Sequence, residues 1–139
     1  MKYLFEWTPE ISVFDTKIDA QHQRLLGQVN TLLSYIVSEK NDAIVIDAVT
    51  FLDKYISEHL AYEEKYMMEH KYPDIENHIK LHEDFIKHYK EFRERLNAGV
   101  SRESLALEIE NYIGNWWLTH IAVEDHKYAG FIKAHESDK

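Results

Sequence analysis

The sequence His59-Leu-Ala-Tyr-Glu63 is followed by Tyr72-Pro73-Asp74 and then by His78-Ile-Lys-Leu-His82. Residues four positions apart lie on one face of an α-helix, and Pro73 suits the start of a new helix. The stretch therefore predicts two antiparallel helices that direct four possible metal ligands toward one place. These are His59, Glu63, His78 and His82.

The composition of the chain favours long helices. The 139 residues fit one domain with a real core, and only four glycines and two prolines leave little room for the turns of an all-β fold. A net charge of −9 argues against a nucleic-acid or anionic-membrane partner. The chain lacks cysteine, which excludes disulfides and thiolate metal sites. With no apolar run for membrane insertion at the N-terminus, we expect a soluble, cytoplasmic protein.

Four stretches carry apolar residues at alternating steps of three and four, the period of an amphipathic helix. They predict helices over about residues 18–40, 42–70, 74–97 and 102–127. Short connections between them predict an all-α fold, an up-down-up-down four-helix bundle in a single domain over residues 1–139. An extended N-terminal arm (residues 1–17) precedes the bundle, and a short C-terminal tail follows it.

Several residues suit the predicted helix ends. Asp15 or Thr16, Asn41 and Ser101 are candidate N-caps. Gly99 can take the left-handed conformation that ends a helix.

Five of the nine histidines fall on the apolar faces of these helices. In an up-down bundle, the start of the first helix, the end of the second, the start of the third and the end of the fourth share one end of the molecule. At 1.5 Å per residue, the polar residues on these faces lie within roughly 6–11 Å of that end or one turn deeper. They are His22, His59, Glu63, His78, His82 and His120. The other histidines have no evident role; they are His70, His88, His126 and His135.

Taken singly, each of the five histidines is best interpreted as a hydrogen-bonded core residue. Taken together they cannot be, because each unsatisfied group costs roughly 1–3 kcal/mol and the faces supply almost no partners except one another. A metal site satisfies them all. Imidazole and carboxylate ligands without thiolate suit iron, zinc, copper or manganese, and five histidines with two carboxylates suffice for two bridged ions.

The predicted fourth helix offers two acids for this site. Helical phase favours Glu124, about 40° from His120, over Asp125 at about 140°. A π-bulge, common at functional sites, would place Asp125, five residues after His120, on the same face as His120.

Four blocks of the chain resemble the hemerythrin family, in particular its bacterial single-domain members. The first is Trp7 followed by Ile18-Asp-Ala-Gln-His22. The others are His59-x-x-x-Glu63-Glu64-x-x-Met67, His78-x-x-x-His82 and His120-Ile-x-x-x-Asp125-x-x-Tyr128, in family order and spacing. The resemblance covers nearly the whole chain and favours Asp125 over Glu124.

The resemblance implies a non-haem di-iron centre that binds dioxygen reversibly. His78, His82 and His120 would bind one iron, and His22 and His59 would bind the second, which keeps an open position. Glu63 and Asp125 would bridge the ions (Fe2+/Fe3+), together with an oxo or hydroxo group. Where the family often has Trp-Leu, this chain has Trp116-Trp117. With Leu60 and Ile121 these tryptophans are candidate walls of an apolar pocket, although plain core packing is the favoured explanation of the extra indole.

Other functions remain open at this point. A di-iron oxidase of the carboxylate-rich type uses paired Glu-x-x-His motifs, which this chain lacks. That favours a carrier or storage protein over an enzyme, with slow oxidase, peroxidase or nitric-oxide chemistry as alternatives. A sensor of oxygen or nitric oxide, acting through a protein partner, is the third interpretation.

Overall fold

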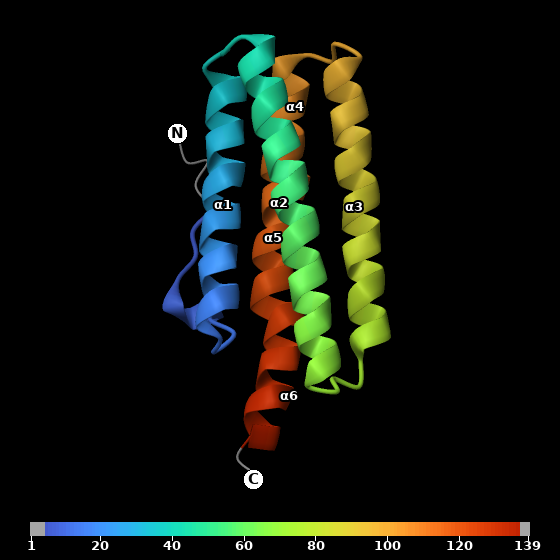
Figure 1. Cartoon of the computed structure of the whole chain (residues 1–139). Helices are drawn as coiled ribbons and strands as arrows, with labels where there is room; N and C mark the ends of the chain where they lie inside the picture. Colours follow the sequence, from blue (N-terminus) through green and yellow to red (C-terminus); the bar gives the residue numbers. More distant parts are fainter. Residues whose placement is uncertain (1–4, 137–139) are drawn as a thin grey trace.

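The computed structural model describes residues 5–136, so residues 1–4 of the predicted arm and 137–139 of the predicted tail lie outside the described residues. Four antiparallel rods confirm the predicted all-α bundle (Figure 1). The first three are α1 (Thr16–Val37), α2 (Asp42–Glu69) and α3 (Ile75–Asn97). The fourth rod comprises α4 (Arg102–Glu108), η2 (Ile109–Ile113), α5 (Gly114–Thr119), η3 (His120–Asp125) and α6 (His126–Glu136).

The predicted N-caps are confirmed by hydrogen bonds, whereas the first helix ends at Val37 instead of near residue 40. The Asp15 carboxylate accepts from the Ile18 amide at the start of α1, and the Asn41 side chain accepts from Ile44 at the start of α2. Ser101 caps α4 in the same way. Gly99, with φ of 83°, takes the left-handed conformation after α3.

The fourth rod is longer than the sequence predicts. We expect its end near residue 127, followed by a tail, but the helix continues to Glu136. Tyr128 and Ile132 are one turn apart and both buried, so the apolar face does not stop at residue 127. Gly130 is tolerated inside the helix rather than ending it.

Two segments of the fourth rod are π-helical, namely η2 and η3. A π-turn closes hydrogen bonds between residues five apart and inserts one extra residue into the helix. The π-bulge anticipated between His120 and Asp125 is therefore confirmed, and η3 spans those two residues.

The N-terminal arm packs along the bundle through polar and apolar contacts. It includes η1 (Pro9–Ile11). The Phe5 amide donates to the Asn30 side chain over 2.9 Å, and Asn30 donates back to the Phe5 carbonyl over 3.1 Å. The Phe5 ring lies against Gly114 of α5, where a Cβ atom would collide with it. Gly114 thus makes room for the arm.

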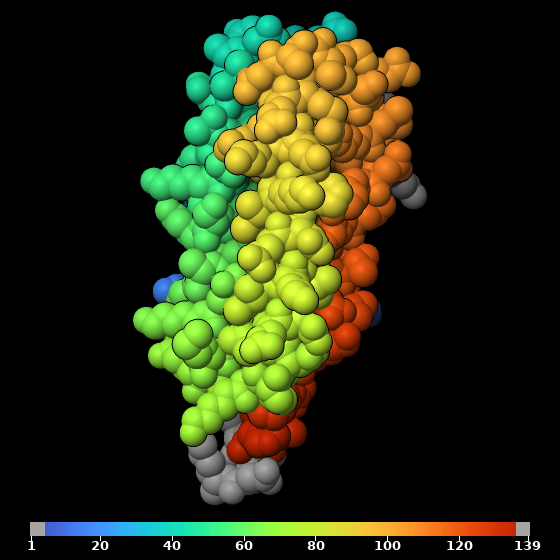
Figure 2. All heavy atoms as spheres, turned by 90° about the vertical axis from the view of Figure 1, so that its right-hand side faces the viewer, coloured from blue at the N-terminus to red at the C-terminus, as the bar shows by residue number. Residues whose placement is uncertain are grey.

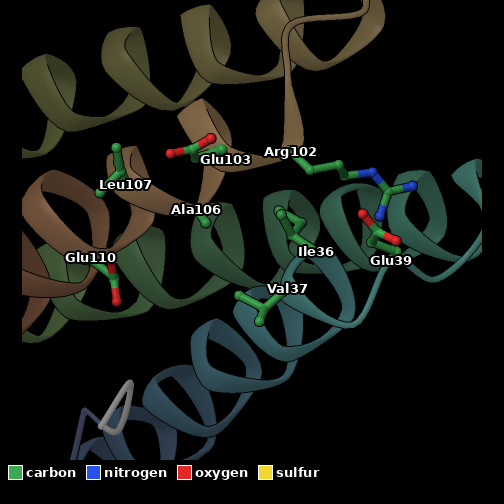
Figure 3. A pocket seen from close by; sticks show the side chains of 8 residues that line it. All are labelled: Ile36, Val37, Glu39, Arg102, Glu103, Ala106, Leu107 and Glu110. Atoms are coloured by element: carbon green, nitrogen blue, oxygen red, sulfur yellow. The ribbon is translucent and has the colours of Figure 1, made fainter. Parts of the chain in front are cut away.

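Arg102 fixes the end of the bundle that carries the 38–41 connection. Its guanidinium donates to the Lys40 carbonyl over 2.6 Å and to the Asp42 carboxylate over 2.9 Å. A surface pocket of about 290 Å³ lies beside it (Figure 3). The pocket is lined by Ile36, Val37, Glu39, Arg102, Glu103, Ala106, Leu107 and Glu110. None of the candidate metal ligands lines this pocket, and Arg102 is already committed to the connection.

On one side of the molecule, α3 lies between α2 and the fourth rod (Figure 2). Its buried residues include His78 and His82, so both side chains face the interior rather than this surface. No helix within residues 5–136 combines the length and the apolar character needed to cross a membrane.

We expect Gly114→Ala to lower the free energy of unfolding by about 1–3 kcal/mol, because the added methyl group displaces the Phe5 ring and loosens the arm. Gly27→Ala is the matched control, since a Cβ atom added to Gly27 of α1 would meet nothing within 4 Å. That change should raise the free energy of unfolding by up to about 1 kcal/mol. Chemical denaturation measures both; equal effects would contradict the role of Gly114.

Candidate metal centre

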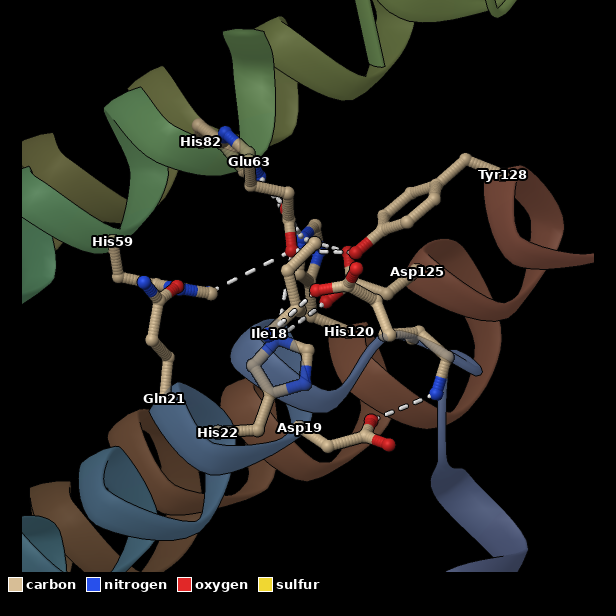
Figure 4. A network of polar contacts seen from close by, with 12 residues as sticks. Ile18, Asp19, Gln21, His22, His59, Glu63, His82, His120, Asp125 and Tyr128 are labelled. Carbon is tan, nitrogen blue, oxygen red and sulfur yellow. Dashed lines mark hydrogen bonds and ion pairs between the residues drawn. The ribbon is translucent and has the colours of Figure 1, made fainter. Parts of the chain in front are cut away.

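All four rods contribute to one buried polar cluster (Figure 4). His22 comes from α1, two ligand candidates each come from α2 and α3, and two come from η3. Every member is at most 3% exposed. The members are His22, His59, Glu63, His78, His82, His120 and Asp125, the seven residues singled out in the sequence.

The cluster divides into two groups of possible ligand atoms that share Glu63. The atoms within each group lie within 4.8 Å of one another. The larger group, here called the triad group, holds three imidazoles and two carboxylates: Glu63, His78, His82, His120 and Asp125. The smaller group, here called the dyad group, holds His22, His59 and Glu63.

Glu63 presents a different oxygen to each group. Its Oε1 lies 3.1 Å from Nε2 of His78 and 3.0 Å from Nε2 of His82. Its Oε2 lies 3.4 Å from Nε2 of His22 and 3.6 Å from Nε2 of His59. One carboxylate therefore spans both groups.

The two carboxylate oxygens of Asp125 also face different groups. Its Oδ1 lies 2.9 Å from Nε2 of His78 and 3.0 Å from Nε2 of His120, in the triad group. Its Oδ2 lies 3.1 Å from Nε2 of His22, in the dyad group. Glu124, the acid that plain helical phase favours, instead pairs with Lys127 and is 27% exposed at its side chain.

Hydrogen bonding inside the cluster is incomplete. Among the described residues, hydrogen-bond geometry is not met at either ring nitrogen of His22, at Nε2 of His59 or at either carboxylate oxygen of Asp125, although the Asp125 oxygens lie close to three imidazoles. Each unsatisfied buried group costs about 1–3 kcal/mol. Imidazole nitrogens and carboxylate oxygens are suitable ligands for a transition metal ion, so the donor set fits a non-haem metal site.

Three further residues orient the cluster, and none of them is assigned this role from the sequence. The Gln21 side-chain oxygen lies 2.7 Å from Nδ1 of His59, and the Glu64 carboxylate lies 2.8 Å from Nδ1 of His82. The Tyr128 hydroxyl donates to Oε2 of Glu63 over 3.1 Å. A partner on Nδ1 leaves Nε2 free to bind a metal. The sequence carries a signal for these residues, because all three lie within the family-like blocks: Gln21 and Glu64 directly beside a ligand candidate, and Tyr128 three residues after one.

The four histidines without an expected role lie outside both groups. In three of them, Nδ1 contacts a main-chain carbonyl one turn earlier in its own helix, which is an ordinary surface arrangement; these are His70, His88 and His135. His126 is partly buried, and its Nε2 has no partner among the described residues.

The histidines of the cluster differ in the direction in which their pKa values are shifted. Burial by itself lowers the pKa of His22 and His120, but the carboxylates of Asp125 and Glu63 outweigh it and raise these pKa values to about 9 and about 10. His59, fully buried, has its pKa lowered to about 4. Burial would raise the pKa of Glu63, yet the surrounding imidazoles hold it well below its usual range.

The chain matches the family model described as the hemerythrin HHE cation binding domain over residues 13–132. This chain is a member of the hemerythrin family. It is 34% identical to a bacteriohemerythrin of Stenotrophomonas maltophilia, covering 95% of this chain and 84% of that protein. It is 30% identical to a myohemerythrin of Theromyzon tessulatum, covering 91% and 92%.

The fold of the hemerythrin family is seen directly in a solved structure. A crystal structure of a hemerythrin point mutant superposes with a TM-score of 0.80 at 21% identity, covering 94% of this chain and 98% of that one. At this identity the likeness concerns the fold. The bundle and the cation-binding family together agree with a metal site in the buried cluster.

We expect Zn2+ to bind the metal-free protein with release of protons at pH 7. His22 and His120, with raised pKa values, are protonated there and must become neutral to bind a metal. Zinc affinity should therefore rise with pH until about pH 9–10. Calorimetry in buffers of different ionisation enthalpy measures the released protons, and an affinity independent of pH between 6 and 9 would contradict the assignment.

The same shifts set the pH dependence of the metal-free fold. Because the pKa values of His22 and His120 are raised above the unfolded value of 6.5, their contacts with the carboxylates stabilise the fold fully below that pH. This contribution is lost as the pH rises through about 9–10. Thermal melting of the metal-free protein between pH 6 and 10.5 should show the loss, with Zn2+-loaded protein as the control.

Proposed function

We propose that this protein binds dioxygen reversibly at a non-haem di-iron centre. The observation that carries the proposal is the division of both carboxylates: Glu63 and Asp125 each face imidazoles of the triad group with one oxygen and of the dyad group with the other. That arrangement suits two ions bridged by two carboxylates. The hemerythrin family model, described as cation binding, supports a metal at this place.

The proposed ligand sets differ in size. His78, His82 and His120 would hold one iron, and His22 and His59 would hold the other, with Glu63 and Asp125 bridging them beside an oxo or hydroxo group. Counting these ligands gives six for the first ion and five for the second, which leaves one position open for dioxygen. Two ferrous ions would supply one electron each, as reversible dioxygen binding at such a centre requires.

The chain's own contribution is to keep water from the open position. Three large apolar side chains near the ligand candidates in the sequence are at most 2% exposed: Leu60, Trp117 and Ile121. The Trp117 ring lies 5.9 Å from the His59 ring. A closed apolar wall hinders the water and protons that would drive irreversible oxidation.

Trp116 contributes differently from its neighbour Trp117. It is only partly buried and stacks on the His120 ring, with centroids 4.4 Å apart and an angle of 10° between the planes. This stacking fixes the His120 ring in place. We therefore assign the pocket wall to Trp117 and the orientation of a ligand to Trp116.

A binding role suits these residues better than turnover of an organic substrate. The chain contains no Glu-x-x-His motif of the carboxylate-rich di-iron enzymes. The cluster is deeply buried, which would keep a bulky organic substrate away from it. We propose a carrier, storage or delivery protein for dioxygen.

Metal analysis combined with optical spectra tests the proposal. The purified protein should hold about two irons per chain, and the anaerobic ferrous form should gain a charge-transfer band on aeration that disappears when oxygen is removed. One iron per chain, a band that does not reverse, or steady consumption of oxygen with a reductant would each contradict reversible binding by a di-iron centre.

We expect His78→Ala to lose iron and thermal stability together, because His78 contacts both carboxylates and binding is coupled to folding of the site. His88→Ala is the matched control on the same helix, since His88 is exposed and contacts the Asp84 carbonyl of its own helix. It should keep both irons and its melting temperature. Iron content and thermal melting decide, and iron loss in the control would contradict the ligand assignment.

A further inference from the structure

Among the five clustered imidazoles, two have a hydrogen-bond partner on Nδ1 among the described residues, and those partners differ in charge. His82 of the triad group contacts the carboxylate of Glu64 over 2.8 Å. His59 of the dyad group contacts the neutral amide of Gln21 over 2.7 Å. Each of the two metal positions proposed above therefore has one such partner, anionic for the triad group and neutral for the dyad group.

The chemical consequence follows from what each partner can accept. An ionised carboxylate only accepts hydrogen bonds, so Nδ1 of His82 must carry the proton and Nε2 is the lone-pair donor. A carboxylate partner also raises the basicity of the imidazole it contacts, and loss of such partners typically changes metal affinity by about 10–100-fold. An amide partner holds the same ring orientation without adding negative charge.

Local structure holds both partners in place. Gln21 precedes His22 on α1, and its main-chain carbonyl accepts a hydrogen bond from the Tyr55 hydroxyl of α2 over 3.1 Å. Glu64 follows Glu63 on α2 and reaches His82 on α3, with a side chain that is 31% exposed. Both contacts join neighbouring rods, and both imidazoles are at most 1% exposed. Each partner contacts its buried ring directly, over 2.8 Å or less, so the ring responds to the difference between amide and carboxylate even though the Glu64 side chain is partly exposed.

We propose that Gln21 and Glu64 are positioning residues that make the two metal positions unequal: Glu64 strengthens binding by the triad group, and Gln21 keeps the dyad group a weaker, less electron-rich donor set. This inference rests on the two-metal site of the proposed function. It adds that the open position is the one with the neutral partner. A metal there receives less electron density and gives up its own electrons less readily, which favours reversible over irreversible oxidation.

A purely structural role is the competing explanation, since both hydrogen bonds also tie rods together. Changing the charge of each partner distinguishes the structural role from the electrostatic one. The substitutions Gln21→Glu and Glu64→Gln preserve the size of the side chain and an accepting oxygen while changing the charge. Each has a matched control with the same change of charge at an exposed position on the same helix. The controls are Gln23→Glu on α1 and Glu69→Gln on α2.

Zinc binding to the metal-free proteins is the first readout, measured by calorimetry as two successive steps. Gln21→Glu should tighten the weaker step about 10-fold and leave the stronger step unchanged. Glu64→Gln should weaken the stronger step by a similar factor. Both controls should match the parent protein. Changes in melting temperature without changes in zinc affinity, or equal effects on both steps, would overturn the proposal in favour of a structural role.

The iron-loaded protein gives a second readout. Gln21→Glu should lower the midpoint potential and shorten the lifetime of the oxygenated form several-fold, whereas Gln23→Glu should change neither. If zinc shows the unequal steps but the iron protein fails to bind oxygen, the proposed function fails and this inference stands. If oxygen binds reversibly and the exchanged partners change neither zinc affinity nor potential, the inference fails and the proposed function stands.

Discussion

The structure depends on seven polar side chains that share one buried layer without enough hydrogen-bond partners. Each rod supplies at least one of them, and no rod supplies more than two. The layer forms only when the four rods keep their relative heights, because a slip of one residue moves a ligand by about 1.5 Å and turns it by about 100°. The caps at the helix starts and the bonds of Arg102 to the 38–41 connection therefore support the site from a distance.

This polar layer also divides the hydrophobic core. On one side lies the larger cluster, which includes Leu25 of α1, Ile56 of α2 and Trp117 of α5. On the other lies a smaller cluster that includes Ile18 and Tyr128. The two clusters stabilise the bundle by burial, whereas the layer between them leaves polar atoms unsatisfied. A bound metal would convert the weakest layer of the bundle into a cross-link between all four rods.

Much of this could be predicted from the sequence, because periodicity and depth along a helix are both local quantities. They suffice for the bundle, the caps and the meeting of five imidazoles with Glu63. The partners Gln21 and Glu64 could not be found in this way, because they lie beside the apolar face rather than on it. Tertiary contact between rods gives them their role. The prediction ends the fourth helix near residue 127, whereas the helix continues to Glu136 because Ile132 packs in the smaller core cluster.

Asp125 is buried instead of Glu124 for a physical reason that can be recognised in the spacing of the buried residues. Six of the buried residues of the fourth rod recur every four positions: Leu105, Ile109, Ile113, Trp117, Ile121 and Asp125. In a regular α-helix twenty residues overshoot five turns by about 200°, so this series would wind to the opposite side. The π-helical segments η2 and η3 insert the residues that keep it facing the core. In this rod, a run of four-residue steps is thus the sequence signal for π-turns. The two π-helical segments bring Trp117 and Asp125, not the preceding Trp116 and Glu124, to the buried face.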